Sequence, residues 1–255
     1  MRFNVKSISA LNNYLEEFGI ELDDKQLEAF NRYYELLIEW NNRINLTAIT
    51  EFDEVLKKHF LDSLSIVKAK DEKLISDIIS GREATLIDIG CGAGFPSVPL
   101  KIAFPNLKVT MLDSLNKRIN FLNEVIEQLG LKNIEAIHGR AEDYAGKGKL
   151  RENYDIVVSR AVANLSTLSE YCLPYVKVNG IFVAYKAEVL KSELDTGLYS
   201  LETLGGKISN IYNFILPYTE YNRNLCIVNK VKPTPAKYPR KAGMPSKEPL
   251  GTANC

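Results

Sequence analysis

The stretch LIDIGCGAGFP at residues 86–96 places three glycines at alternate positions directly after an apolar run. An apolar run that leads into closely spaced glycines is typical of a strand that turns sharply into a helix. Glycine lets the backbone approach a ligand closely, and the N-terminus of the following helix favours negative charge. Pro96 suits the first turn of that helix. The stretch therefore predicts a ligand-binding loop between a strand and a helix.

Short apolar runs alternate with amphipathic helical segments after Gly81. The clearest helix covers 116–129, where apolar residues form one stripe that Gly130 closes. The expected strands, which share a short apolar run, are residues 85–89, 108–112, 134–137, 155–159 and 181–185. Repeated βα units predict a parallel sheet that is covered by helices on both faces.

Two further strand-like runs follow a helix that is expected at about 189–204. They cover 207–216 and 223–231 and are joined by a turn that contains proline. Such a pair predicts a terminal hairpin, in which one strand runs antiparallel to the others. The expected fold class is therefore α/β, with a Rossmann-like, mostly parallel seven-stranded sheet and an antiparallel C-terminal hairpin strand.

Helical spacing of apolar residues dominates the chain before residue 81. Leu27, Phe30 and Leu37 share one helical face, and Asp23 can cap the helix that carries them. The organisation expected from these patterns has three parts: a helical N-terminal region at 1–80, a cofactor-binding domain at 81–232 and a basic, proline-rich tail at 233–255.

Composition places the chain in the ordinary range of soluble proteins. Its 255 residues are 45% hydrophobic and 25% charged, and the formal net charge is zero, so a nucleic-acid surface has to come from local clustering. The four cysteines form no C-x-x-C pair and have no histidine at metal-ligand spacing, which predicts a reducing compartment and no metal. The N-terminus does not resemble a signal peptide, and no apolar stretch approaches about 18 residues. We therefore expect a cytoplasmic protein with no membrane partner.

Acidic residues flank the glycine loop in the way that an adenosine cofactor requires. The residue where a dinucleotide loop would have its third glycine is Phe95, so the glycine spacing alone is weak evidence. The second expected strand, however, ends in an acid that can accept hydrogen bonds from both ribose hydroxyls. The candidate cofactor residues of this pattern are Asp88, Gly90, Gly92, Gly94 and Asp113.

Nicotinamide cofactors and S-adenosylmethionine share this adenosine. No tyrosine in the chain has a lysine four residues later, which argues against one common hydride-transfer site. The acid before the glycines and the sequence HGRAED after the third strand, with Ala141 and Glu142, favour S-adenosylmethionine. A nicotinamide-dependent oxidoreductase and a cofactor-binding protein without catalysis remain the alternatives.

A combination of motifs resembles the RsmG/GidB family of bacterial 16S rRNA guanine-N7 methyltransferases, historically named glucose-inhibited division protein B. The resemblance runs from about Trp40 to Leu250 and rests on WNNRINLTAIT, HFLDSL, LIDIGCGAGFPSVPLKIAFP, LDSLNKRINFL, GRAED, SRAVANL and YPRKAGMPSKEPL. It implies a class I methyltransferase fold, S-adenosylmethionine as the cofactor, and 16S rRNA or the small ribosomal subunit as the partner. The family's target guanine lies in the decoding-region loop.

The resemblance also implies individual cofactor contacts. Carried over by motif, they fall on Gly90, Phe95, Ala141, Glu142 and Arg160. Phe95 can wall the methionine part of the pocket, and Arg160 can reach a carboxylate or a phosphate. The family often has Lys-Gly after the fifth strand, whereas this chain has Lys186-Ala187, so the role of Lys186 stays open.

The expected chemistry needs no general base. Guanine N7 has an in-plane lone pair, so the enzyme mainly has to align donor and acceptor and exclude water. We therefore name no catalytic residue. Cys91 is interpreted as a small loop residue and not as a nucleophile. His59 and Asp62 can either line the substrate mouth or make helix contacts.

The tail is the one strongly basic segment of the chain. Residues 230–247 contain six lysines or arginines, four prolines and no acid, which predicts an extended strip that follows a phosphate backbone, with Tyr238 available to stack. A solvated tail is the alternative. The candidate RNA-binding residues are Lys237, Arg240, Lys241 and Lys247, and we expect them to lie outside the cofactor pocket.

Overall fold

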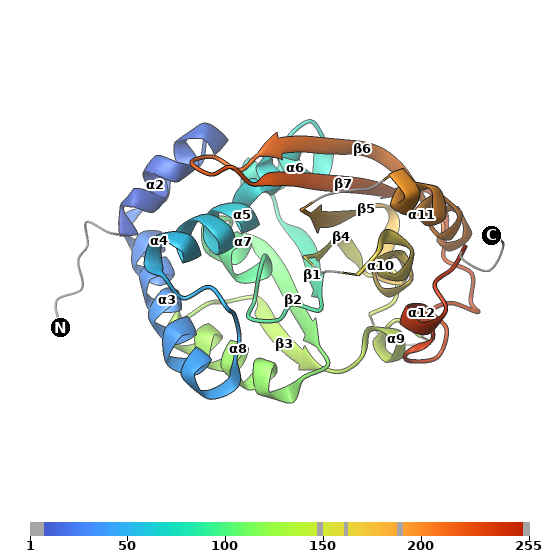
Figure 1. Ribbon diagram of the computed structural model, residues 1–255, viewed down its shortest axis with the longest axis horizontal. Coiled ribbons are helices and arrows are strands. Elements are labelled where there is room, and N and C mark those ends of the chain that lie inside the picture. The colour runs from blue at the N-terminus through green and yellow to red at the C-terminus, as the bar shows by residue number, and fades with distance from the viewer. Residues whose placement is uncertain (1–7, 147–149, 161–162, 188–190, 252–255) are drawn as a thin grey trace.

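A seven-stranded sheet forms the centre of the computed structural model, which describes residues 8–146, 150–160, 163–187 and 191–251 (Figure 1). Its strand order is β3-β2-β1-β4-β5-β7-β6. Strands β1 to β5 are all parallel to one another, and β7 is antiparallel to both of its neighbours, β5 and β6. The strands are β1 Ala84–Ile89, β2 Leu107–Asp113, β3 Ile134–His138, β4 Tyr154–Ser159, β5 Val176–Lys186, β6 Gly206–Ile215 and β7 Asn222–Lys230. The predicted sheet and its hairpin are confirmed.

Strand β5 begins earlier than the sequence predicted. Val176 pairs with Tyr154, and the register then shifts before Ile181 pairs with Ile156. An added Cβ at Gly180 would lie 2.7 Å from the carbonyl oxygen of Asp155, so this irregularity needs a glycine. The bulge interrupts the apolar pattern, which is why the pattern predicted only the second part of the strand.

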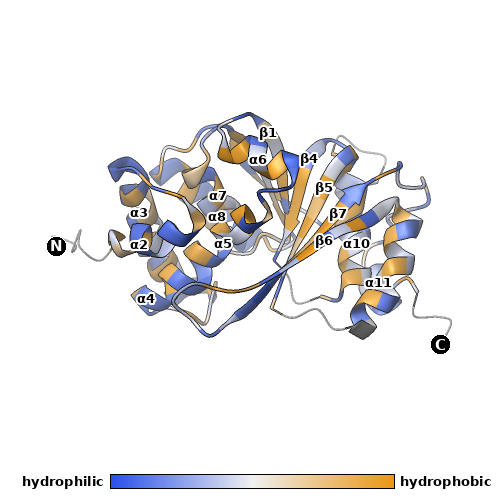
Figure 2. Cartoon of the chain, turned by 90° about the horizontal axis from the view of Figure 1, so that it is seen from above, coloured by the Kyte–Doolittle hydropathy of each residue, from blue (hydrophilic) through white to orange (hydrophobic). Residues whose placement is uncertain are grey.

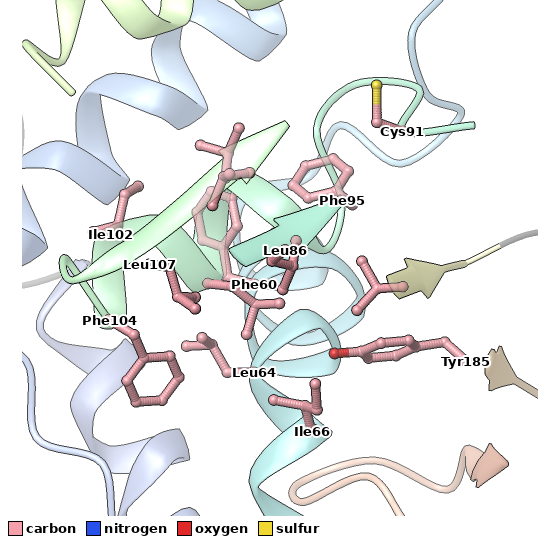
Figure 3. Close-up of a cluster of buried hydrophobic side chains, with 14 of the residues drawn as sticks. Phe60, Leu64, Ile66, Leu86, Cys91, Phe95, Ile102, Phe104, Leu107 and Tyr185 are labelled. Atoms are coloured by element: carbon pink, nitrogen blue, oxygen red, sulfur yellow. The ribbon is translucent and has the colours of Figure 1, made fainter. Parts of the chain in front are cut away.

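One face of the sheet packs against N-terminal helices together with α7 and α8 (Figures 1 and 2). The longest of them, α3, begins with a capping box between Asp23 and Gln26. Phe60 and Leu64 from the N-terminal helices join Leu86 and Tyr185 from the strands in one buried cluster (Figure 3). The helices on this side are α2 Ala10–Leu15, α3 Asp24–Ile44, α4 Phe52–Val55, the π-helix η2 Leu56–Leu61, α5 Asp62–Leu64, α6 Lys73–Ile79, α7 Ser97–Ala103 and α8 Asn116–Gln128.

The opposite face packs against a second buried cluster (Figure 2). Along β1, Leu86 joins the first cluster and Ile87 the second, as the alternation of side chains in a strand requires. The helices on this side are α9 Ala141–Tyr144, α10 Leu165–Cys172 and α11 Lys191–Leu204, whose expected first residues at 189 and 190 lie outside the described part.

The chain after β7 folds back onto this second face and includes the short helix α12 Met244–Lys247 (Figure 1). Tyr238 is only 8% exposed and belongs to the second cluster. Lys230 is buried, and its ammonium donates to the carbonyl oxygen of Leu173 and to Thr234. The prediction of an extended tail is therefore wrong for residues 233–251, because apolar and polar contacts hold this segment against the domain. Within the described residues, no helix has the length and apolar character needed to cross a membrane.

Candidate cofactor and substrate site

A cavity of about 260 Å³ opens at the carboxyl ends of the central parallel strands. In open α/β sheets, ligands bind at this edge. Apolar side chains and glycine backbone form much of the wall, and polar groups from the ends of β2 and β4 and from α9 complete it. The cavity is lined by Ile89, Gly90, Leu112, Asp113, Ser114, Gly139, Arg140, Ala141, Glu142, Ser159, Ala163, Leu168 and Tyr171.

The glycines of the loop differ in what surrounds them. Gly90 and Gly92 have φ of +73° and +60°, and a Cβ added to either would meet no atom within 4 Å. A Cβ at Gly94 would lie 2.7 Å from Val98 and 2.9 Å from the side chains of Leu122 and Tyr33. Gly90 therefore offers open backbone to the cavity, whereas Gly94 is required by packing, a role that its spacing did not predict.

Asp113 holds the glycine loop to the end of β2. Its carboxylate is 3% exposed and accepts hydrogen bonds from the N–H groups of Gly92 and Leu115, both at 2.9 Å, and from Arg118 at 3.1 Å. A carboxylate has about four acceptor positions, so one remains for a ligand hydroxyl at the cavity wall. Asp113 thus shapes the loop and also lines the cavity.

Glu142 lines the cavity from α9 and is held by the C-terminal part of the chain. Its Oε1 accepts a hydrogen bond of 2.7 Å from the N–H of Gly243. The neighbouring Ala141 accepts at its carbonyl oxygen from the Tyr175 hydroxyl at 2.6 Å. No residue of the tail lines the cavity, but Gly243 contacts a residue of its wall.

Phe95 and Arg160 do not line this cavity and form a second cluster beside the glycine loop. The Phe95 ring, shown in Figure 3, stacks on His59 with centroids 4.4 Å apart, and the Arg160 guanidinium lies 5.0 Å from its centre. Arg160 also forms an ion pair with Asp62 at 3.1 Å. Of the predicted cofactor residues, four line the cavity, and Phe95 and Arg160 form this second cluster; the four are Gly90, Asp113, Ala141 and Glu142.

Asp62 and His59 are buried participants in this cluster. Arg223 donates to the other oxygen of Asp62 at 2.7 Å, so two arginines bracket one carboxylate. Arg160 donates to Nδ1 of His59 at 3.3 Å, which leaves the Nε2 hydrogen for Thr47 at 2.8 Å. Burial, followed by the charge of Arg160, lowers the pKa of His59 to about 3. His59 is therefore a neutral, fixed ring in a π-helix, an element that often marks functional sites.

Sequence patterns did not identify Arg223 or Thr47. Arg223 is the second residue of β7, far from any motif used to predict the site. Its contact with Asp62 depends on β7 being inserted between β5 and β6. In the sequence, only His59 and Asp62 of HFLDSL indicated that a polar cluster could form here.

Asp88 lies beneath the loop and not in the cavity wall. It is fully buried, its Oδ2 accepts from the N–H of Ser97 at 3.3 Å, and its Oδ1 has no partner among the described residues. Burial raises the pKa of Asp88 to about 7. Its visible role is to hold the first turn of α7 after the glycines.

The predicted RNA-binding residues do not share one environment. Lys237, Lys241 and Lys247 are exposed. Arg240 instead donates through Nε and a terminal nitrogen to the buried carboxylate of Glu170, at 3.0 and 2.7 Å. Because its guanidinium is engaged, Arg240 is not a free phosphate ligand, and the buried Tyr238 is not available to stack.

Cys91 and Lys186, both considered from the sequence, have defined surroundings. Cys91 is 2% exposed, and burial raises its pKa well above the ordinary thiol value, which agrees with a loop residue and not with a nucleophile. Lys186 forms an ion pair with Glu193 and donates to the carbonyl oxygen of Ala163 at 2.9 Å.

The chemistry of the cavity fits an adenosine group. Ile89, Leu112 and Leu168 offer apolar walls to a base, while Asp113 and Glu142 offer carboxylates to hydroxyl or amino hydrogens. The open face of Gly90 leaves room for close approach to the backbone.

A family model described as rRNA small subunit methyltransferase G (GidB) matches residues 26–225. The chain belongs to this family. It is 55% identical over 236 residues to ribosomal RNA small subunit methyltransferase G of Lachnoclostridium phytofermentans, covering 92% of this chain and 94% of that one. It is 49% identical over 244 residues to the protein of that name from Bacillus subtilis, covering 96% of this chain and 99% of the other.

Family membership decides among the functions that the sequence left open. RsmG/GidB membership, a class I methyltransferase fold and methyl transfer from S-adenosylmethionine are confirmed. A nicotinamide oxidoreductase and a protein without catalysis are not favoured.

Proposed function

We propose that the protein transfers the methyl group of S-adenosylmethionine to N7 of a guanine in 16S rRNA, in the decoding-region loop that the family targets. The observation that carries this proposal is a cavity of about 260 Å³ beside a glycine loop in a chain whose relatives are named ribosomal RNA small subunit methyltransferase G. We place the reaction in the cytoplasm.

The cavity residues would hold the adenosine part of the cofactor. Asp113 would accept a ribose hydroxyl, and Ala141 and Glu142 would bracket the adenine edge. Phe95 and Arg160, beside the loop, would wall the methionine part and bind its carboxylate. Bound S-adenosylmethionine supplies a methyl group on an electrophilic sulfonium.

The protein's part in the transfer is alignment and exclusion of water. Guanine N7 attacks through a lone pair, so no proton has to be removed first. This agrees with the groups near the loop: His59 is neutral with both ring nitrogens engaged, and Cys91 is a buried thiol with a raised pKa. Proximity and orientation alone can supply several kcal/mol of a barrier of this kind, of the order of 7–11 in the best cases.

We further propose that Lys237, Lys241 and Lys247 bind rRNA phosphates. All three are exposed and lie on the segment that contacts the cavity wall through Gly243. Lysines on a surface that follows the phosphate backbone of RNA raise the affinity for RNA without recognising its sequence. Recognition of the guanine itself then has to come from groups nearer the glycine loop.

The test is methyl transfer in vitro. Purified protein is incubated with radiolabelled S-adenosylmethionine and either naked 16S rRNA or small subunits, and the modified nucleotide is mapped. Label on guanine N7 supports the proposal, and comparison of the two substrates shows which one the enzyme uses. Label on another base atom, or none on either substrate, contradicts it.

A further inference from the structure

The segment 234–250, here called the C-terminal strap, is fixed by polar side chains of the domain. Arg151 donates to the carbonyl oxygens of Thr234 at 2.7 Å and of Tyr238 at 2.8 Å. On α10, Thr167 donates to the carbonyl oxygen of Pro245 at 3.1 Å, and Ser166 donates to that of Leu250. Such an array of side chains reaching backbone carbonyls specifies one position for the strap.

The centre of the strap is an arginine bound to a fully buried carboxylate. Glu170 on α10 is 0% exposed and receives the backbone N–H of Arg240 at 2.7 Å as well as two nitrogens of its guanidinium. The hydrogen bonds to Glu170 raise the pKa of Arg240. A bidentate pair of this kind is geometrically demanding and costly to break from one side.

The strap then donates a hydrogen bond to a residue of the cavity wall. Gly243, three residues after Arg240, has φ of +85° and donates its N–H to Oε1 of Glu142 at 2.7 Å. Glu142 is 9% exposed and lines the cavity. The direction of one cavity carboxylate therefore depends on a backbone donor that Arg240 and Glu170 hold in place.

We propose that the C-terminal strap supports the wall of the cofactor pocket and that Arg240 is a positioning residue, which fixes Gly243 so that Glu142 points at the bound adenosine. This inference rests on the proposed binding of S-adenosylmethionine in the cavity. It has a thermodynamic consequence: if strap docking favours cofactor binding, cofactor binding must favour strap docking by the same factor.

A double-mutant cycle on the affinity for S-adenosylhomocysteine tests the route through Glu142. We expect Arg240→Met and Glu142→Gln each to weaken binding about tenfold. The double variant should be no more than about tenfold weaker than wild type, because both changes disable the same contact, the one between the Glu142 carboxylate and the adenosine. Lys232→Met, which removes an exposed cation just before the strap, is the control and should leave the affinity unchanged. The inference is overturned if the double variant binds S-adenosylhomocysteine about a hundredfold more weakly than wild type, so that the two effects are independent, or if Arg240→Met has unchanged affinity.

A second measurement does not depend on a variant at Arg240, which leaves Glu170 buried without its partner. Trypsin cleavage after Lys241 and Lys247 reports how often the strap detaches. Saturating S-adenosylhomocysteine should slow this cleavage several-fold in the wild-type protein and much less in Glu142→Gln at equal occupancy. No slowing in wild type, or equal slowing in both, overturns the inference. If wild type does not bind the ligand at all, the proposed function fails instead.

Discussion

Replacing glycines of the loop one at a time separates a ligand-facing position from a packing position. Gly90 and Gly94 both have positive φ, +73° and +94°, so alanine at either carries a backbone strain of about 1–2 kcal/mol. The two positions differ in their surroundings. A Cβ at Gly90 meets open space at the cavity wall, whereas a Cβ at Gly94 meets side chains of α7, α8 and α3 at 2.7–2.9 Å.

The expected magnitudes follow from these contacts. In Gly94→Ala, the free energy of unfolding should fall by the strain of about 1–2 kcal/mol and by a further amount of about 1–3 kcal/mol from overpacking, because the three neighbours of the added methyl group are buried. In Gly90→Ala, the free energy of unfolding should fall only by the backbone strain. Its methyl group would, however, occupy space next to the bound cofactor, and we expect the affinity for S-adenosylhomocysteine to fall at least about tenfold, or about 1.4 kcal/mol.

The assay is urea unfolding for stability and calorimetric titration for S-adenosylhomocysteine affinity, on both variants and the wild type. Folded Gly94→Ala should bind with nearly wild-type affinity, since its Cβ points into the core. Wild-type affinity in Gly90→Ala would refute the assignment of the cavity. Equal stability of the two variants would refute the packing role of Gly94.

Three further perturbations have defined outcomes. Asp113→Asn should weaken S-adenosylhomocysteine binding by about 1–3 kcal/mol, as expected for a hydrogen bond to a charged group; equal wild-type affinity for the 2′-deoxyribose analogue would count against a ribose contact. His59 has a pKa of about 3 in the folded protein and about 6.5 unfolded, so the unfolded state binds more protons, and stability present above pH 6.5 is lost as the pH falls toward 3. Between pH 7.5 and 5.5 this residue should cost about 1.4 kcal/mol of the free energy of unfolding, a loss that urea titrations should find missing in His59→Asn. Alanine at Lys237, Lys241 and Lys247 together should reduce the slope of log affinity for single-stranded rRNA against log salt by about 2 and leave cofactor affinity unchanged, and parallel slopes would mean that these lysines do not touch phosphate.

The sheet could be predicted because its strands carry short apolar runs bounded by turn residues. Three features of the candidate site could also be predicted, since each follows a strand at the edge where ligands bind. They are the loop glycines, the acid at the end of β2 and the sequence GRAED. Strand β5 was only partly predicted, because the bulge at Gly180 hides its first part.

The parts that could not be predicted depend on contacts between distant segments. Composition predicts that a basic, proline-rich tail is extended, but Glu170 and Glu142 lie far from it in sequence and supply the acceptors that fold it back. The spacing of Gly94 resembles that of the other loop glycines, and only the packed neighbours reveal its different role. Arg223 is likewise brought to Asp62 by the order of the strands.

The protein is proposed to methylate one guanine of 16S rRNA at N7. The direct measurement is a map of methylated nucleotides in 16S rRNA from cells with and without this protein, with Gly90→Ala supplied as the matched binding-defective variant. We expect that one N7-methylguanine in the decoding-region loop is lost without the protein, returns with the wild-type chain and returns much less with Gly90→Ala. An unchanged map of N7-methylguanine in cells that lack the protein would contradict it.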